Sequence, residues 1–211
     1  MMKCSRDNKR VLYHADYQSV LEQNQKADLI IADPPYNLEL ADWDKDFDFE
    51  VMVNVISQII KPTGSALIFN ILPNVLEIYP FAEKYGLVVQ DLMVWAKPNF
   101  QVKYLRKKGY VNKNREFILW LSASDTAFFQ LKPNEKYHNG IFSYASPAGG
   151  FRFQKPKPLI DDLILRHSQP MNTVIDLFAG SGVVAQSCRQ WKRIYQGYEL
   201  DDDLFEKIDL H

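Results

Sequence analysis

Short, continuous apolar segments that alternate with helix-length segments are the feature that most constrains the fold of this chain. The run Asp28 to Ala32 (DLIIA) is apolar without alternation, as expected of a strand buried on both faces. Asn172 to Phe178 (NTVIDLF) has the same character, and a helical pattern follows each run. This alternation predicts an α/β fold with a mainly parallel central sheet.

The rest of the pattern predicts an order of elements. Lys61 to Gly64 is typical of a turn, and Gly86 marks the end of a helix. The segments Leu87 to Trp95 and Phe117 to Leu121 are expected to form an antiparallel edge pair. The other expected strands are Val11 to Ala15, Asp28 to Ala32, Ser65 to Phe69, Asn172 to Phe178 and Ile194 to Glu199. The expected helices are Tyr17 to Gln23, Phe49 to Ile60, Asn74 to Tyr85, Leu159 to His167, Val183 to Gln190 and the tail.

Composition excludes several classes of protein. The 25 Lys and Arg against 26 Asp and Glu give a net charge of −1, which excludes a uniformly basic nucleic-acid coat but allows a local basic patch. Cys4 and Cys188 have no second Cys or His at metal-ligand spacing, so neither a disulfide framework nor a metal site is expected. The start of the chain has no signal-like apolar region, and no stretch reaches ~18 uninterrupted apolar residues. We therefore expect a soluble, cytoplasmic protein.

A glycine-containing turn follows the strand that ends near Phe178. The segment Asp176 to Gly182 leads directly into a helix; glycines allow a ligand to approach the backbone, and the helix N-terminus offers unpaired N–H groups. Glu199 ends the next strand, where an acid can accept hydrogen bonds from both hydroxyls of a ribose. The pattern favours a nucleoside-containing ligand, and the alternative is a tight turn with a helix cap.

Asp33-Pro34-Pro35-Tyr36 is the more specific motif. It ends a buried strand at the edge where open α/β sheets bind their ligands. Proline fixes φ, so a carboxylate, the Pro34 carbonyl and the Tyr36 ring are held in one stiff turn. Two acceptors and a stacking ring suit a planar base with an exocyclic amine. The alternative is a proline-rich strand terminator with a buried tyrosine.

Together, Asp-Pro-Pro-Tyr and Asp176-x-Phe178-x-Gly180-x-Gly182 resemble the S-adenosylmethionine-dependent amino-methyltransferases of DNA, and their order resembles the circularly permuted β-class. Further matches are Asp16, Trp95-x-Lys97-Pro98-Asn99, Arg115-Glu116-x-Ile118-Leu119 and Gln154-Lys155-Pro156. The resemblance implies a Rossmann-like methyltransferase fold that is circularly permuted. It also implies a single domain over residues 1–211, with a small inserted target-recognition region at about 98–153.

The resemblance also implies roles for the matching residues. Asp33 and the Pro34 carbonyl would accept the amine hydrogens, and Tyr36 would stack on the base. The implied cofactor residues are Asp16, Lys155, Asp176, Phe178, Gly180, Gly182 and Glu199; capping the helix after it is an alternative role for Asp16.

The implied activity is methyl transfer from S-adenosylmethionine to the N6 amine of adenine in double-stranded DNA after base flipping, as in restriction-modification. N4 methylation of cytosine is an alternative, although those enzymes more often carry Ser in place of Asp33. A non-catalytic DNA-binding subunit is another.

The stretch Lys97 to Arg115 contains no acid and interleaves aromatic residues with its cations, which favours phosphate contact over a solvated loop. Its basic residues are Lys97, Lys103, Arg106, Lys107, Lys108, Lys113 and Arg115. The acidic loop Asp42 to Asp48 would repel phosphate, so we expect a lid or a face turned away from DNA. Because the recognition region is small, a homodimer or a partner subunit could complete it.

Overall fold

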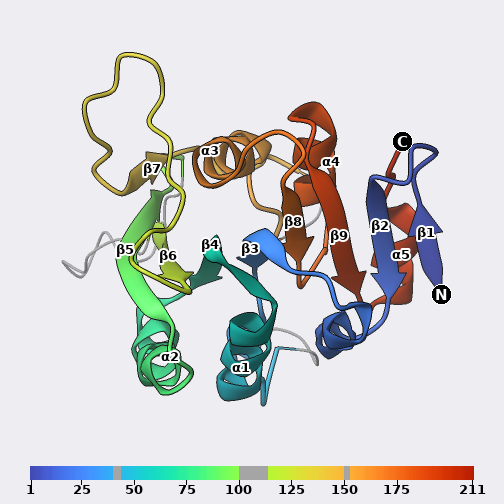
Figure 1. Cartoon of the computed structure of the whole chain (residues 1–211), viewed down its shortest axis with the longest axis horizontal. Coiled ribbons are helices and arrows are strands. Elements are labelled where there is room, and N and C mark those ends of the chain that lie inside the picture. Colours follow the sequence, from blue (N-terminus) through green and yellow to red (C-terminus); the bar gives the residue numbers. More distant parts are fainter. Residues whose placement is uncertain (40–43, 100–113, 150–152) are drawn as a thin grey trace.

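The computed structural model describes residues 1–39, 44–99, 114–149 and 153–211. In these residues nine strands form one sheet with helices on both faces (Figure 1). The strands are β1 (Met2–Cys4), β2 (Arg10–His14), β3 (Ala27–Ala32), β4 (Ile60–Asn70), β5 (Val88–Ala96), β6 (Arg115–Ser122), β7 (Ile141–Ser143), β8 (Thr173–Asp176) and β9 (Ile194–Glu199). Their order in the sheet is β1-β2-β9-β8-β3-β4-β6-β5-β7, and only β1 and β6 run against the others. The predicted α/β fold with a mostly parallel sheet is confirmed.

The sheet separates two hydrophobic cores. One face is covered by the 3-10 helix η1 (Tyr17–Gln23), α1 (Phe49–Ile59) and α2 (Leu72–Lys84). The other face is covered by α3 (Lys157–His167), α4 (Val183–Gln190) and α5 (Asp202–Lys207). Within β3, Ile30 belongs to the first core and Ile31 to the second, so this strand is buried on both faces as its apolar run predicts. No helix in the described parts of the chain is long and apolar enough to cross a bilayer.

Two expectations about local structure need correction. The segment predicted as a turn at Lys61 to Gly64 lies inside β4, where the register jumps from Ala27 opposite Ile60 to Leu29 opposite Ser65. The extra residues therefore form a bulge. The strand begins at Ile60, before the apolar segment that was expected to start it at Ser65. The predicted antiparallel pair is β5 and β6, but it does not form the edge, because β7 pairs with β5 on the outside.

Strand β6 also divides the stretch 98–153, which we expected to be one elaborated region. β6 lies between β4 and β5 in the sheet, and its residues Leu119 and Leu121 are buried in the core under α1 and α2. β6 therefore separates the connection that follows β5 from the residues after Ser122, which include the short strand β7.

The topology identifies the edge at which a ligand can bind. The chain leaves β3 through α1 and enters β4 on one side, whereas it leaves β8 through α4 and enters β9 on the other side. Strands β3 and β8 are neighbours, so the sheet changes direction between them. Open α/β sheets bind ligands at such a switch point, outside the carboxyl ends of the strands. Asp33 directly follows β3, and the glycine turn directly follows β8.

Candidate active site

The turn after β3 is fixed by two polar side chains. Asp44 is buried; its Oδ1 accepts a hydrogen bond from the backbone N–H of Tyr36 at 2.6 Å and its Oδ2 one from Leu38 at 3.2 Å. Asn74 Nδ2 donates to the Tyr36 carbonyl at 2.8 Å. The expectation that the acidic loop is a lid or an outward face is wrong for Asp44, because this carboxylate shapes the Asp-Pro-Pro-Tyr turn. The part of that loop at 40–43 lies outside the described residues.

The Asp33 carboxylate is part of a four-charge network. Lys155 Nζ donates to Asp33 Oδ1 at 2.7 Å and to Oδ2 at 2.6 Å, and it lies 3.4 Å from Glu116 Oε2. Lys97 Nζ pairs with the other Glu116 oxygen and lies 4.3 Å from the centre of the Trp95 ring. Positive and negative charges thus alternate from Lys97 to Asp33, with no net charge.

The Tyr36 hydroxyl lies between the two carboxylates of this network. Its oxygen is 3.0 Å from Asp33 Oδ1 and 3.2 Å from Glu116 Oε2. A phenol has one proton, so it can donate to only one of these acceptors at a time. Burial, together with both carboxylates, raises the pKa of Tyr36 well above its ordinary value, so the hydroxyl keeps its proton.

Burial and pairing set the ionisation of the other members. Burial raises the pKa of Asp33, and the Glu116 charge adds to this effect while the Lys155 ammonium opposes it. Burial would also raise the pKa of Glu116, but Lys155 and Lys97 lower it overall. Burial would lower the pKa of Lys155, yet its two carboxylate partners raise it overall. Glu116 and Lys155 therefore form an ionised pair beside a carboxylate that is easier to protonate than usual.

The glycine turn places open backbone next to this network. Gly180 has φ +50°, and a Cβ built there would meet only the Phe178 carbonyl, at 3.9 Å. The Gly180 N–H donates to Glu199 Oε2 at 2.7 Å, so the acid that ends β9 holds the turn. Gly182 has φ +74°, and a Cβ there would lie 2.9 Å from Ile208. Gly180 thus borders open space, whereas Gly182 is required by packing against the C-terminal tail.

Asp176 and Phe178 hold the turn in place through hydrogen bonds and ring packing. Asp176 is buried, accepts hydrogen bonds from the Tyr195 hydroxyl at 3.2 Å and the Phe178 N–H at 3.3 Å, and burial raises its pKa to about 7. The Phe178 ring packs against Tyr17 and Phe47, with centroids 5.1 and 5.6 Å away. A nearby exposed carboxylate, Asp16, caps η1 by accepting from the Gln18 N–H at 2.9 Å. Its alternative role as a helix cap is therefore observed, and its cofactor role stays a prediction.

The structure brings most of the predicted site residues to one edge of the sheet. Asp33, Tyr36 and Lys155 touch one another, and the residues of the glycine turn follow the adjacent strand β8. The predicted DNA contacts are less complete, since Lys103, Arg106, Lys107, Lys108 and Lys113 lie outside the described residues. Arg115 is exposed at the start of β6, but Lys97 is directed to Glu116. We therefore leave Lys97 out of the proposed phosphate contacts.

Sequence reasoning missed three residues of this site: Glu116, Asp44 and Asn74. Glu116 had a usable signal, because it is a lone acid at the start of an otherwise apolar strand and lies in a motif that matches the family. Asp44 and Asn74 had none, since their partners are backbone groups of a turn that is distant in sequence.

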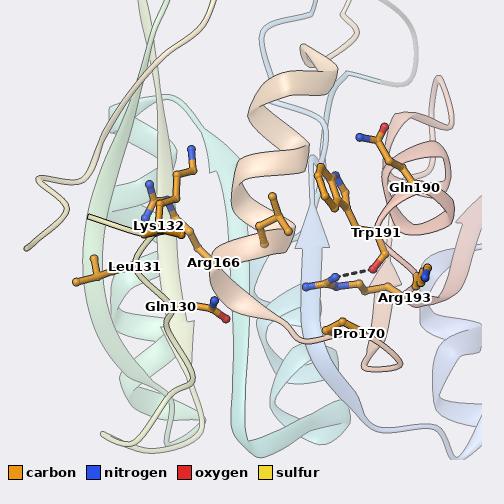
Figure 2. A pocket seen from close by; sticks show the side chains of 11 residues that line it. Gln130, Leu131, Lys132, Arg166, Pro170, Gln190, Trp191 and Arg193 are labelled. Atoms are coloured by element: carbon orange, nitrogen blue, oxygen red, sulfur yellow. Dashed lines mark hydrogen bonds between the residues drawn. The ribbon is translucent and has the colours of Figure 1, made fainter. Parts of the chain in front are cut away.

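A separate pocket of about 450 Å³ lies at the opposite edge of the sheet (Figure 2). Its lining includes Pro170, which precedes β8, and the turn 191–193, which precedes β9. These are the amino ends of the two strands. The guanidinium of Arg193 is bound to the Trp191 carbonyl, as Figure 2 shows, and to Ser168. None of the predicted catalytic or cofactor residues lines this pocket.

Comparison with known proteins decides the family. Residues 27–209 match the profile of the N6/N4 DNA methylases, whose description is DNA methylase. The chain belongs to this family. Among relatives of this methylase, the Type II methyltransferase M2.DpnII of Streptococcus pneumoniae is 22% identical over 238 residues, covering 93% of this chain and 87% of that protein. M.HinfI of Haemophilus influenzae is 25% identical over 228 residues, covering 87% of this chain and 63% of that protein.

Solved structures agree with this assignment. The crystal structure of the M1.HpyAVI–SAM complex is similar with a TM-score of 0.78 at 30% identity, over 93% of this methylase and 95% of that chain. The PvuII DNA methyltransferase, which is cytosine-N4-specific, matches with a TM-score of 0.77 at 14% identity, over 93% and 83% of the two chains. That second likeness shows the methyltransferase fold alone.

Proposed function

We propose that this DNA methylase transfers a methyl group to the N6 amine of adenine in double-stranded DNA, after the base is flipped out of the helix. The observation that carries the proposal is the Asp33-Pro34-Pro35-Tyr36 turn at the switch point of the sheet, with its carboxylate bound by Lys155 and by the Tyr36 hydroxyl. The amine is inaccessible in a stacked duplex, so the base must leave the stack to reach this turn.

The proposed cofactor is S-adenosylmethionine, and the glycine turn fits it. The open space at Gly180 and the carboxylate of Glu199 form a cradle at the carboxyl ends of β8 and β9. Phe178 and Asp176 would support this cradle, and Glu199 would accept hydrogen bonds from the ribose hydroxyls. The cofactor supplies an electrophilic methyl group. One similar structure, M1.HpyAVI, was solved as a SAM complex, which supports the same choice here.

Asp33, Pro34 and Tyr36 would activate the amine. An exocyclic amine is a poor nucleophile because its lone pair is delocalised into the ring. Hydrogen bonds from its two N–H groups to Asp33 and to the Pro34 carbonyl would favour a pyramidal nitrogen, and the Tyr36 ring would hold the base by stacking. The methylated nitrogen must then lose a proton; Asp33, whose pKa burial raises and whose side chain is 27% exposed, can hold that proton before solvent takes it.

Adenine is favoured over cytosine by the residue that begins the turn. The Asp33 carboxylate gives a stronger acceptor than the serine more often found in cytosine-N4 enzymes. The fold does not separate the two bases, because the family includes N6 and N4 methylases and the cytosine-N4-specific PvuII enzyme has the same fold. The order of the two motifs, with Asp-Pro-Pro-Tyr first, supports a circularly permuted, β-class arrangement.

Recognition of the DNA site is proposed for the two segments on either side of β6, within about 98–153. The basic residues between 100 and 115 would contact phosphates, with Arg115 at the base of that segment. The region is small, which supports a second copy of this chain or a partner subunit as the completing element. Pairing with a restriction enzyme is proposed from the Type II relatives.

The test is the chemistry of the modified base. Duplex DNA incubated with the protein and S-adenosylmethionine is digested to nucleosides and analysed by mass spectrometry, with Asp33→Ala as the control. N6-methyldeoxyadenosine that depends on Asp33 supports the proposal, whereas N4-methyldeoxycytidine would replace it with the alternative reaction. Absence of any product, together with absence of cofactor binding in calorimetry, would indicate a non-catalytic subunit.

A further inference from the structure

Glu116 is a largely buried member of the charge network to which the proposed chemistry assigns no role. It follows Arg115 at the start of β6, directly opposite Trp95 of β5 in the ladder. Its side chain is 16% exposed, and those of Lys97 and Lys155 are 14% and 8% exposed. Charges this far from water interact strongly, so removing one of them must change the others.

The network presents a conflict at Asp33. Lys155 donates to both oxygens of this carboxylate, and the Tyr36 hydroxyl shares one of them. The target amine needs an Asp33 oxygen as its acceptor. An ammonium has three protons, and the third Lys155 direction is toward Glu116 Oε2, 3.4 Å away, which is longer than a hydrogen bond.

We propose that Glu116 is a positioning residue for methyl transfer, which receives the Lys155 ammonium and the Tyr36 hydroxyl when the target amine takes an oxygen of Asp33. This inference rests on the proposed function. The exchange breaks one hydrogen bond from Lys155 to Asp33 and shortens its contact with Glu116. The Tyr36 hydroxyl likewise turns its hydrogen bond from Asp33, 3.0 Å away, to Glu116, 3.2 Å away. No proton is transferred between groups in this step.

Lys97 has a supporting part in this arrangement. It pairs with the Glu116 oxygen that faces away from Lys155 and so keeps that carboxylate ionised. The ionisable groups that act on Asp33 are Lys155, Glu116 and Tyr36, and Asp176 of the neighbouring strand acts from the other side. Among them, the Glu116 charge raises the pKa of Asp33 and the Lys155 charge lowers it.

Glu116→Gln keeps the shape of the side chain and removes its charge. Lys155 then has no charged acceptor other than Asp33, so kcat should fall about tenfold, a typical coupling within one ion-pair network. Because the negative charge that raises the pKa of Asp33 is gone, the acid limb of kcat/KM against pH should move to lower pH. A merely structural loss would lower activity and leave the limb in place, and that result would overturn the proposal.

Glu50→Gln is the matched control. Glu50 also binds one lysine and one tyrosine hydroxyl, with Lys84 and Tyr85 as partners, but these belong to the helical layer. Its loss should leave both kcat and the pH profile unchanged. Glu116→Asp keeps the charge and should leave the acid limb in its wild-type position with a kcat between those of the wild type and Glu116→Gln.

A double-mutant cycle tests whether Glu116 acts through Lys155. In a Lys155→Gln background, Glu116→Gln should have little further effect on kcat, because the ammonium that it positions is absent. Additive losses would overturn the proposal. The cycle can be scored on whichever methylated base forms, so a wrong target base would refute the proposed function without deciding this question.

Lys97→Met provides a second test of the network if the Glu116→Gln variant does not fold. It keeps Glu116 and removes a positive charge from the network, so the acid limb should move to higher pH, opposite to the expected shift for Glu116→Gln. A limb that stays in place or moves to lower pH would overturn the proposal.

Discussion

Substitutions at the two glycines of the turn after β8 should have different consequences: Gly182 is needed mainly for folding, and Gly180 mainly for cofactor binding. Both positions have positive φ, so any side chain costs ~1–2 kcal/mol in backbone strain at either one. At Gly182 a Cβ would also lie 2.9 Å from Ile208, and such overpacking adds ~1–3 kcal/mol. Gly182→Ala should therefore lower the free energy of unfolding by roughly 2–5 kcal/mol, the sum of the two costs.

Gly180→Ala should lower the free energy of unfolding by only the backbone cost, because its Cβ would meet nothing closer than the Phe178 carbonyl at 3.9 Å. Gly180→Leu has the same backbone cost and should be about as stable as Gly180→Ala. The larger side chain would occupy the open space of the cradle, so affinity for S-adenosylmethionine should fall from glycine to alanine and be lost with leucine. The series thus separates folding from binding at a single position.

Two measurements check this prediction. Urea unfolding of the ligand-free protein gives the stability difference, and titration calorimetry of the folded variants gives the affinity for S-adenosylmethionine. The reasoning fails if Gly180→Ala destabilises the ligand-free protein as much as Gly182→Ala. It also fails if Gly180→Leu binds the cofactor with native affinity, since the cradle would then be elsewhere.

Three further predictions concern the chemistry, the pH dependence of stability and the DNA contact. Asp33→Ala should reduce methyl transfer at least ~100-fold in single-turnover assays while cofactor binding persists; Tyr36→Phe should keep substantial activity and Tyr36→Ala should not, and equal loss in both would refute the stacking role. Burial raises the pKa of Asp176 to about 7, well above that of an aspartate in the unfolded chain, so the folded state holds the extra proton and stability should fall as pH rises toward 7. Asp176→Asn should flatten that part of the pH dependence in thermal unfolding, and an unchanged slope would contradict the cause given. The DNA contact is tested by changing four cations to Glu: Lys103, Arg106, Lys107 and Lys108. DNA binding should be lost and cofactor binding kept, and each cation removed should reduce the slope of log affinity against log salt by about one. Native affinity for DNA would indicate a solvated loop.

The sequence alone determined the longer strands and helices and the positions of the two motifs. A short apolar run without alternation that ends at prolines or glycines is typical of a strand covered on both faces, so β3 and β8 could be identified locally. Prolines and glycines at the ends of these runs restrict the backbone by themselves, so the two ligand-facing turns could also be placed. The short strands β1 and β7 carry too few residues for such a pattern.

Only the tertiary structure decided which side chains meet. Lys155 binds Asp33 across 122 residues, and Glu116 reaches Tyr36 across 80. The Glu116 contact depends on the order of strands in the sheet, which places β6 beside β4 and β4 beside β3. The Lys155 contact is made from the segment that leads into α3. Local periodicity reports how a segment is buried, but not which segment becomes its neighbour. The ionisation of the network follows from those neighbours, because burial raises the pKa of Asp33 while pairing with two lysines lowers that of Glu116.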